Sequence, residues 1–172
     1  PHRRHQEKQL VERLSQGLLE GLKILLPVSP LGLGQEILKL LRSHHQFTGR
    51  DWDIWVDGAV AQGCDLYGNL LPQFPLAVQN FAKHQSLFWD ERVKPRMRRL
   101  TSENSPLASS NPYILLTDNL TQLETYCDQG NWLILLPEFI QEFQEFELKS
   151  AKNMAIETYL LSEHSDCPNI TQ

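Results

Sequence analysis

The sequence lacks the features that mark membrane-spanning, fibrous and disordered proteins. Its strongest apolar runs, Tyr113–Leu116 and Trp132–Leu136, are far shorter than the ~20 residues that a transmembrane helix needs. The 9 glycines and 10 prolines in 172 residues are too few for a fibrous chain, and 41% hydrophobic residues are too many for a disordered one. We therefore expect one compact soluble domain with no membrane partner.

Cysteine is also scarce, and its arrangement excludes two common kinds of site. Cys64, Cys127 and Cys167 are far apart and form no C-x-x-C pair, so neither a zinc ribbon nor a redox motif is supported. Free thiols are typical of a reducing compartment, and we expect an intracellular location, in the cytoplasm or nucleus. Because the chain begins with Pro1 rather than Met, we expect a fragment of a larger protein or a processed product.

Several catalytic motifs are missing as well. The sequence contains no Gly-x-x-x-x-Gly-Lys phosphate loop, no Gly-x-Ser-x-Gly elbow and no His-Glu-x-x-His zinc pair. The adjacent pair His44 and His45 does not replace them, because neighbouring residues of a helix point in different directions. Any chemistry must therefore come from less conspicuous residues.

The apolar pattern predicts helices that alternate with strands. Leucines spaced by three and four residues predict a helix over residues 6–26, ended by Pro27 and Pro30. Strands are expected at 52–57, 86–89, 113–116 and 132–136. Further helices are expected at 35–44, 74–84 and 120–127, and from 137 onward with a break near 150 and a resumption through 160. Residues 101–112 are expected to form an exposed loop. This order predicts an α/β fold with a small, mainly parallel, Rossmann-like sheet flanked by helices, and an N-terminal helical pair.

The same pattern divides the chain into three parts. We expect an N-terminal helical segment at 1–48, an α/β domain at 49–165 and a tail at 166–172. The helical pair either packs on the α/β core or forms a hairpin that binds a protein partner. Ordinary core packing is the interpretation that we favour.

Two acidic residues follow predicted strands, namely Asp57 and Asp118. Ligands of an open parallel sheet collect at the carboxyl ends of its strands, so these carboxylates could share Mg²⁺ or Mn²⁺, which orients a water for attack on a phosphodiester. Asp65 and Asp90 could add further ligands. The alternative is that Asp57 and Asp118 cap helices, a routine position for Asp after a strand.

The net charge of −5 hides a basic segment. Five cations fall within eight residues, and they are Arg92, Lys94, Arg96, Arg98 and Arg99. One interpretation is that they bind nucleic-acid phosphates, with Phe88 and Trp89 stacking on bases. The other is a solvated loop whose cations pair with acidic residues of the last helix, Glu138, Glu142, Glu145 and Glu147.

Four segments resemble metal-dependent ribonucleases. Residues 113–123 (Tyr-Ile-Leu-Leu-Thr-Asp-Asn-Leu-Thr-Gln-Leu) and 132–140 look like the C-terminal part of PIN domains, in which a strand ends in Thr-Asp-Asp or Ser-Asn-Asp. Asp118 matches an acidic position of that family, and Asn119 stands where many members have a second Asp. Residues 54–58 resemble the opening strand of NYN ribonucleases and 76–81 their first helix, which implies that Asp57 is the leading metal ligand.

The resemblance leaves three functions open. Between the first helix and the Thr-Asp strand, the family has more chain than residues 86–112 supply. The acidic residues that the family carries on the helix in that interval are not visible in this sequence. We therefore expect a degenerate PIN-like domain of a larger protein in RNA metabolism, which binds single-stranded RNA or a protein. The first alternative is an active endoribonuclease, in which Asp57 and Asp118 are catalytic and Asp57, Asp118 and Asp90 hold Mg²⁺ or Mn²⁺. The second alternative is a protein-interaction scaffold unrelated to RNA.

Overall fold

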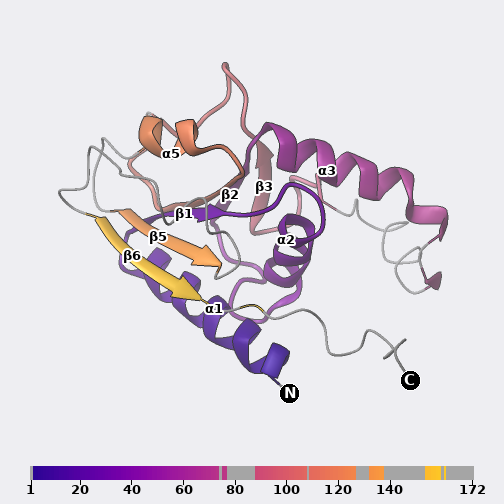
Figure 1. Cartoon of the computed structure of the whole chain (residues 1–172), viewed down its shortest axis with the longest axis horizontal. Coiled ribbons are helices and arrows are strands. Elements are labelled where there is room, and N and C mark those ends of the chain that lie inside the picture. Colours follow the sequence, from indigo (N-terminus) through magenta and orange to yellow (C-terminus); the bar gives the residue numbers. More distant parts are fainter. Residues whose placement is uncertain are drawn as a thin grey trace.

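The chain forms a parallel sheet covered by helices on both faces (Figure 1). The computed structural model describes residues 2–73, 75–76, 88–107, 109–126, 132–137, 154–159 and 161. Its helices are α1 (His2–Leu19), α2 (Leu33–Ser43), α3 (Gly58–Asn69) and α5 (Leu120–Tyr126), with a 3₁₀ turn η1 (Leu71–Gln73). Its strands are β1 (Lys23–Pro27), β2 (Asp53–Val56), β3 (Arg96–Arg99), β4 (Tyr113–Thr117), β5 (Trp132–Pro137) and β6 (Met154–Tyr159).

The strand order is β3-β2-β4-β1-β5-β6, and every neighbouring pair is parallel. β1 and β4 lie at the centre, where Ile24 pairs with Ile114. β3 and β6 are the edges of the sheet. The predicted α/β class with a parallel sheet is confirmed.

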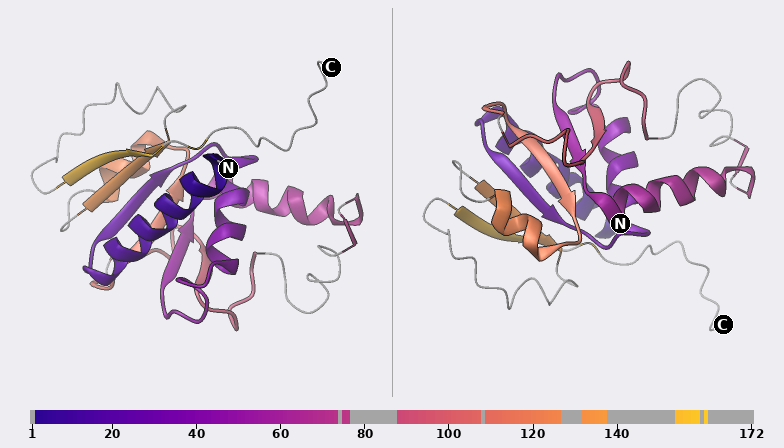
Figure 2. Two further views of the ribbon diagram at one scale, coloured as in Figure 1. Left: turned by 90° about the horizontal axis from the view of Figure 1, so that it is seen from below. Right: turned by 90° about the horizontal axis from the view of Figure 1, so that it is seen from above.

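The helices divide between the two faces of the sheet. The main core joins apolar side chains of α1, α2 and α3 to one face, where Ile24, Ile54 and Ile114 form a row across three strands. The opposite face carries the row Leu25, Trp55 and Leu115, and α5 covers this side. In the two views of Figure 2, α1 is in front when the molecule is seen from below and α5 when it is seen from above.

Residues 23–27 correct the predicted helix over 6–26. Helix α1 ends at Leu19, and Gly21 at φ 82° turns the chain into β1. Leu25 and Leu26 continue the helical leucine pattern, but a central parallel strand is buried on both faces and is apolar without interruption. The N-terminal segment thus supplies the central strand, so the described parts of 1–48 and 49–165 share one sheet and one core.

Three further elements differ from the prediction. Helix α3 was missed because glycines make residues 58–69 read as a break. β3 was missed because three of its four residues are arginines. Residues 154–159 form strand β6 rather than the resumed helix, because they pair with β5 along its whole length. The other predicted elements that fall on described residues are confirmed. They are the strands over 52–57, 113–116 and 132–136, the helices over 35–44 and 120–127, and the described part of the loop over 101–112.

Two predicted helices cannot be compared with the structure. Most of 74–84 and all but the first residue of the helix predicted from 137 onward to 153, with its acidic residues, lie outside the described residues. Its first residue, Pro137, is the last residue of β5 rather than the start of a helix. Of the predicted strand 86–89, the described residues Phe88 and Trp89 are not in a strand. Within the described part of the chain, no helix has both the length and the apolar character needed to cross a bilayer.

Candidate functional site

Asp57 lies at the carboxyl end of β2, where it caps α3. Its Oδ1 accepts a hydrogen bond from the Gly58 backbone N–H at 2.7 Å, and its Oδ2 accepts one from the Thr117 hydroxyl at 2.7 Å. The Gln122 amide adds a longer contact to Oδ1 at 3.4 Å. With 8% of Asp57 exposed, this carboxylate is a buried link between β2, β4 and α5.

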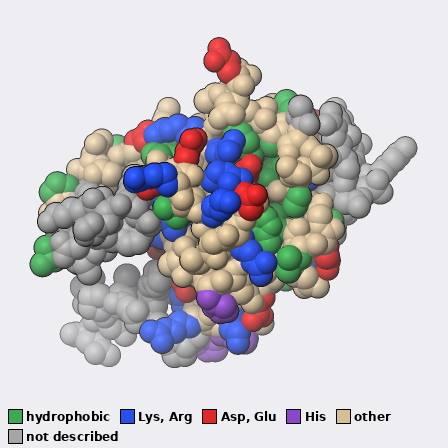
Figure 3. Space-filling model, turned by 180° about the vertical axis from the view of Figure 1, so that it is seen from behind, with side chains coloured by type: hydrophobic (Ala, Val, Ile, Leu, Met, Phe, Trp, Pro, Cys, Tyr) green, Lys and Arg blue, Asp and Glu red, His purple; other side chains and the backbone are tan. Residues whose placement is uncertain are grey.

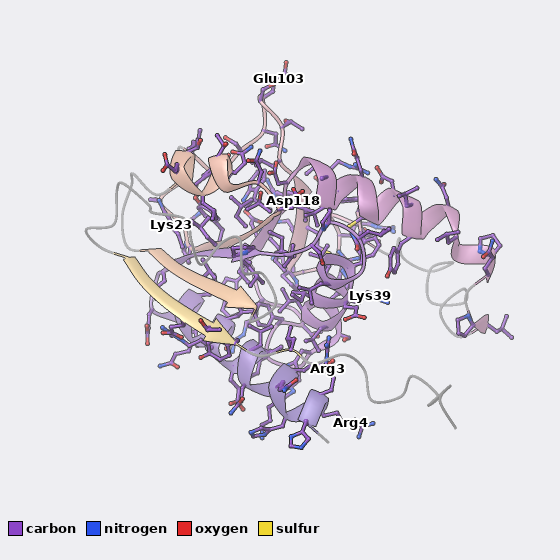
Figure 4. The ribbon with its side chains drawn as sticks, viewed as in Figure 1. Arg3, Arg4, Lys23, Lys39, Glu103 and Asp118 are labelled. Atoms are coloured by element: carbon purple, nitrogen blue, oxygen red, sulfur yellow. The ribbon has the colours of Figure 1, made fainter. Side chains whose placement is uncertain are left out.

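Asp118 follows β4, the strand that neighbours β2, and it is exposed in the turn between β4 and α5 (Figure 4). The capping role at this helix belongs to Asn119, whose Oδ1 accepts from the Thr121 N–H at 2.9 Å. The Asn119 N–H in turn donates to the Thr117 hydroxyl at 3.0 Å. Thr117 therefore connects the buried Asp57 to the Asn119 turn, and sequence reasoning missed both Thr117 and Gln122.

Asp90 is engaged elsewhere. It precedes β3, and its carboxylate accepts from the Arg92 backbone N–H and from two guanidinium nitrogens of Arg92 at 3.0 and 3.1 Å. These hydrogen bonds, together with the more distant charge of Arg42, lower the pKa of Asp90 below its ordinary value. Asp90 thus serves as the partner of Arg92.

The donor set does not fit Mg²⁺ or Mn²⁺. No group of three or more His, Cys, Asp or Glu side chains converges anywhere in the described ranges. Asp57 already accepts hydrogen bonds on both oxygens, and Asp90 is bound to Arg92. Mg²⁺ is usually held by one or two carboxylates together with several waters, and of the three acids predicted to hold it Asp57 and Asp90 are already engaged in these contacts.

The basic segment forms the edge strand β3 and the turn before it. Successive residues of a strand point to opposite faces, so Met97 enters the main core while Arg98 lies against the Trp55 ring, with 5.7 Å between its Cζ and the ring centroid. The loop interpretation is therefore corrected for residues 96–99. The acidic partners that it proposed, Glu138 to Glu147, lie outside the described residues.

Each of the five cations has an acidic neighbour. Arg96 donates to Asp53 at 2.9 Å and lies 2.6 Å from Asp51, and the Lys94 ammonium is 3.8 Å from Asp51. The remaining pairs are Arg92 with Asp90, Arg98 with Asp53, and Arg99 with Asp65. At Arg98 the ion pair is a loose one, because its Nε is 3.5 Å from Asp53 and donates no hydrogen bond within the described residues.

Arg99, Asp65 and Trp89 form a connected cluster. Two guanidinium nitrogens of Arg99 donate to the two carboxylate oxygens of Asp65, one of them at 2.9 Å, and the Trp89 indole N–H donates to Asp65 at 3.2 Å. The Arg99 guanidinium also lies over the Trp89 ring, 4.2 Å from its centroid. Because Arg99 bonds to Asp65, the pKa of that carboxyl is lowered and the pKa of the guanidinium is raised.

A pocket of about 320 Å³ lies at this edge of the sheet, beside Trp89, Arg98, Arg99 and Asn104. β3 is toward the back of Figure 1, and Figure 3 shows that rear face, where Lys and Arg side chains gather with Asp and Glu side chains between them. Phe88, the other aromatic residue proposed for stacking, is 2% exposed and packs edge-to-face on Tyr67. The structure thus brings together Trp89, Arg98 and Arg99, whereas Arg92 pairs with Asp90 and Arg96 with Asp51 and Asp53.

Sequence reasoning missed several residues of this region. Asp51, Asp53 and Asn104 carried no motif, and Asp65 was considered only as a metal ligand. One signal was available, because Arg96 and Arg98 alternate with Met97 at the period of a strand.

The comparisons with known proteins add one functional indication. No family model matches the chain. It is 43% identical over its full length to an uncharacterized protein of Synechocystis sp. (strain ATCC 27184 / PCC 6803 / Kazusa), of which it covers 32%. It is 24% identical to an RNase J-like protein of Methanocaldococcus jannaschii, a match that covers 96% of the chain and 43% of that protein. The chain thus spans less than half the length of both curated relatives, and its similarity to an RNase J-like protein is distant.

Proposed function

We propose that this chain is an α/β domain of a larger protein of RNA metabolism, and that it binds single-stranded RNA at the outer edge of β3 without cleaving it. The observation that carries the proposal is the pocket beside Arg98, Arg99 and Trp89. The distant RNase J-like relative supports RNA as the ligand. The PIN-like and NYN-like resemblance stays a prediction, since neither relative's name refers to those families.

The charge chemistry of this edge suits a polyanion. Arg98 and Arg99 have 32% and 42% of their side chains exposed, and β3 has no strand on its outer side in the described sheet. Exposed ion pairs contribute at most about 1 kcal/mol each, so Asp53 and Asp65 do not prevent these guanidiniums from binding phosphates. A guanidinium has five N–H donors, and Asp65 occupies only two of those of Arg99.

The carboxyl ends of β2 and β4 support a binding role better than a catalytic one. Asp57 is buried and accepts hydrogen bonds from Gly58 and Thr117, which is the geometry of a helix cap. Asp118 is exposed and belongs to no group of three or more potential metal ligands among the described residues. Cleavage by this domain is therefore the alternative that the test below must exclude.

The binding test is fluorescence anisotropy with a labelled single-stranded RNA of twelve nucleotides at several salt concentrations. Replacing Arg98 and Arg99 by Gln is expected to weaken binding at least ~10-fold and to reduce the salt slope by about 0.7 for each phosphate contact that is lost on the single strand. The matched control replaces Arg4 and Lys39 by Gln, which removes the same charge from α1 and α2 (Figure 4). Equal losses in both double variants would contradict a site at β3.

The cleavage test uses the same RNA with Mn²⁺. We expect no cleavage by the parent chain or by its Asp57→Asn and Asp118→Asn variants. Cleavage by the parent that disappears in Asp118→Asn would instead establish the endoribonuclease alternative.

A further inference from the structure

We propose that the pocket at the outer edge of β3 is a subsite for one RNA nucleotide carrying a single phosphate, an inference that rests on the proposed RNA-binding function. The pocket is formed by β3, by the turn before it and by the loop after it. Its volume of about 320 Å³ is at the small end of the ~300–1,000 Å³ that small-molecule sites have, which suits one nucleotide rather than a longer stretch.

Two differently held guanidiniums supply the phosphate ligands. Arg99 is fixed in orientation, because Asp65 bonds to two of its nitrogens and the Trp89 ring lies under it. Such a pre-oriented guanidinium loses little further freedom when it binds an oxyanion. Arg98 lies against Trp55, and its Nε is buried, 3.5 Å from Asp53 and without a hydrogen bond among the described residues, so its terminal guanidinium nitrogens are the donors that we assign to phosphate.

Neutral polar groups lie opposite the arginines. The backbone of Asn104 is fixed by two hydrogen bonds, since its N–H donates to the Thr101 hydroxyl at 2.9 Å and its carbonyl accepts from the Thr101 N–H at 3.0 Å. Its side-chain amide has no hydrogen bond among the described residues and lines the pocket. An amide presents both donors and an acceptor, which match the edge of a nucleobase, while Trp89 provides apolar surface for the sugar or base.

The charge of the lining limits how much phosphate can enter. Three carboxylates accompany Arg98 and Arg99, namely Glu91 in the lining and the ion-pair partners Asp53 and Asp65. A triphosphate would bring more negative charge close to these carboxylates than a single phosphate does. The subsite therefore favours a nucleoside monophosphate or an internal RNA phosphate over a triphosphate.

The test is displacement of the labelled RNA by single nucleotides, combined with a substitution that fills the pocket without changing its charge. In the wild-type chain, adenosine 5′-monophosphate is expected to displace the RNA at least ~5-fold more effectively than adenosine, inorganic phosphate or adenosine triphosphate. Asn104→Trp is expected to abolish displacement by the monophosphate and to weaken RNA binding ~3- to 10-fold at an unchanged salt slope. The control is Ser102→Trp, in the same exposed loop but outside the lining, for which wild-type behaviour is expected.

The possible outcomes separate the two proposals. If the wild-type chain does not bind RNA, the proposed function fails. If it binds RNA but Asn104→Trp behaves like Ser102→Trp, only the subsite is overturned. Displacement by inorganic phosphate or by an acidic peptide as effectively as by the monophosphate would also overturn it. Equal thermal midpoints of the two variants, measured by circular dichroism, show that both are folded.

Discussion

Two carboxylates on one helix, Asp57 at the start of α3 and Asp65 eight residues later, have opposite surroundings. Asp57 is buried and accepts hydrogen bonds from neutral groups, the Gly58 N–H and the Thr117 hydroxyl. Asp65 has 47% of its side chain exposed and binds the cationic Arg99. The first carboxylate joins parts of the fold, and the second lies beside the arginine that we assign to RNA. An acid at the end of a strand is therefore not a catalytic candidate until its hydrogen-bond partners are known.

The largest expected effect is a loss of stability on replacing the buried carboxylate, Asp57. Asp57→Ala removes the cap of α3 and leaves the buried Thr117 hydroxyl without its acceptor, so we expect a loss of about 2–3 kcal/mol in the free energy of unfolding. Urea denaturation monitored by circular dichroism measures it. Asp118→Ala is the control, with a loss below about 0.5 kcal/mol because Asp118 is exposed. Similar losses in both variants would contradict a structural role specific to Asp57.

A smaller effect on stability, dependent on pH, is expected on removing the arginine that pairs with the exposed carboxylate, Asp65. Arginines lower the pKa values of Asp51, Asp65 and Asp90 below the ordinary 3.8. A carboxyl whose pKa is lowered by folding contributes stability that is complete above its unfolded pKa and is lost as pH falls through its folded pKa. Arg99→Gln should therefore lower the stability at pH 7 slightly, by at most about 1 kcal/mol, and with it the thermal midpoint; the difference from wild type should shrink as pH falls below 3.8 and vanish below the lowered pKa of Asp65. A difference that persists unchanged at pH 3 would contradict this origin.

The smallest effect concerns binding. Asp65→Asn keeps an acceptor for Arg99 and for the Trp89 indole but removes a negative charge beside the pocket. RNA affinity should rise about threefold at 50 mM salt, and the gain should shrink at 200 mM salt because the charge is then more strongly screened. Anisotropy titrations measure it, with Glu103→Gln at the exposed loop as the charge-matched control (Figure 4). A lowered affinity in Asp65→Asn would contradict the charge argument.

The elements that the sequence predicted correctly are those in which local pattern and final environment agree. Residues 113–117 are an apolar run that becomes a fully buried central strand, and Asp57 follows a strand and caps a helix. Residues 23–27 were assigned to a helix because their leucines extend the spacing of α1, and only their pairing with β4 and β5 reveals a strand. That pairing depends on residues about 90 positions away, which a local pattern does not contain.

The site was predictable in its charges but not in its geometry. The cluster of cations at 92–99 is visible in the sequence, whereas the acids that accompany it come from other elements: Asp51 and Asp53 at the start of β2, and Asp65 on α3. β3 was missed because a strand rich in arginine has no apolar alternation to detect, apart from Met97. The environment of Asp57 was equally hidden, since its partner Thr117 is 60 residues away.

The central position of β1 also affects the order in which this protein can fold. β1 leaves the ribosome before its partner β4, which is made about 90 residues later, a delay of roughly 5 to 20 s at ordinary rates of synthesis. During that time the strand Lys23–Pro27 has neither neighbour of the finished sheet, because β5 follows β4. Pairings this distant in sequence make folding slow, so the nascent chain exposes an apolar segment to aggregation until β4 arrives.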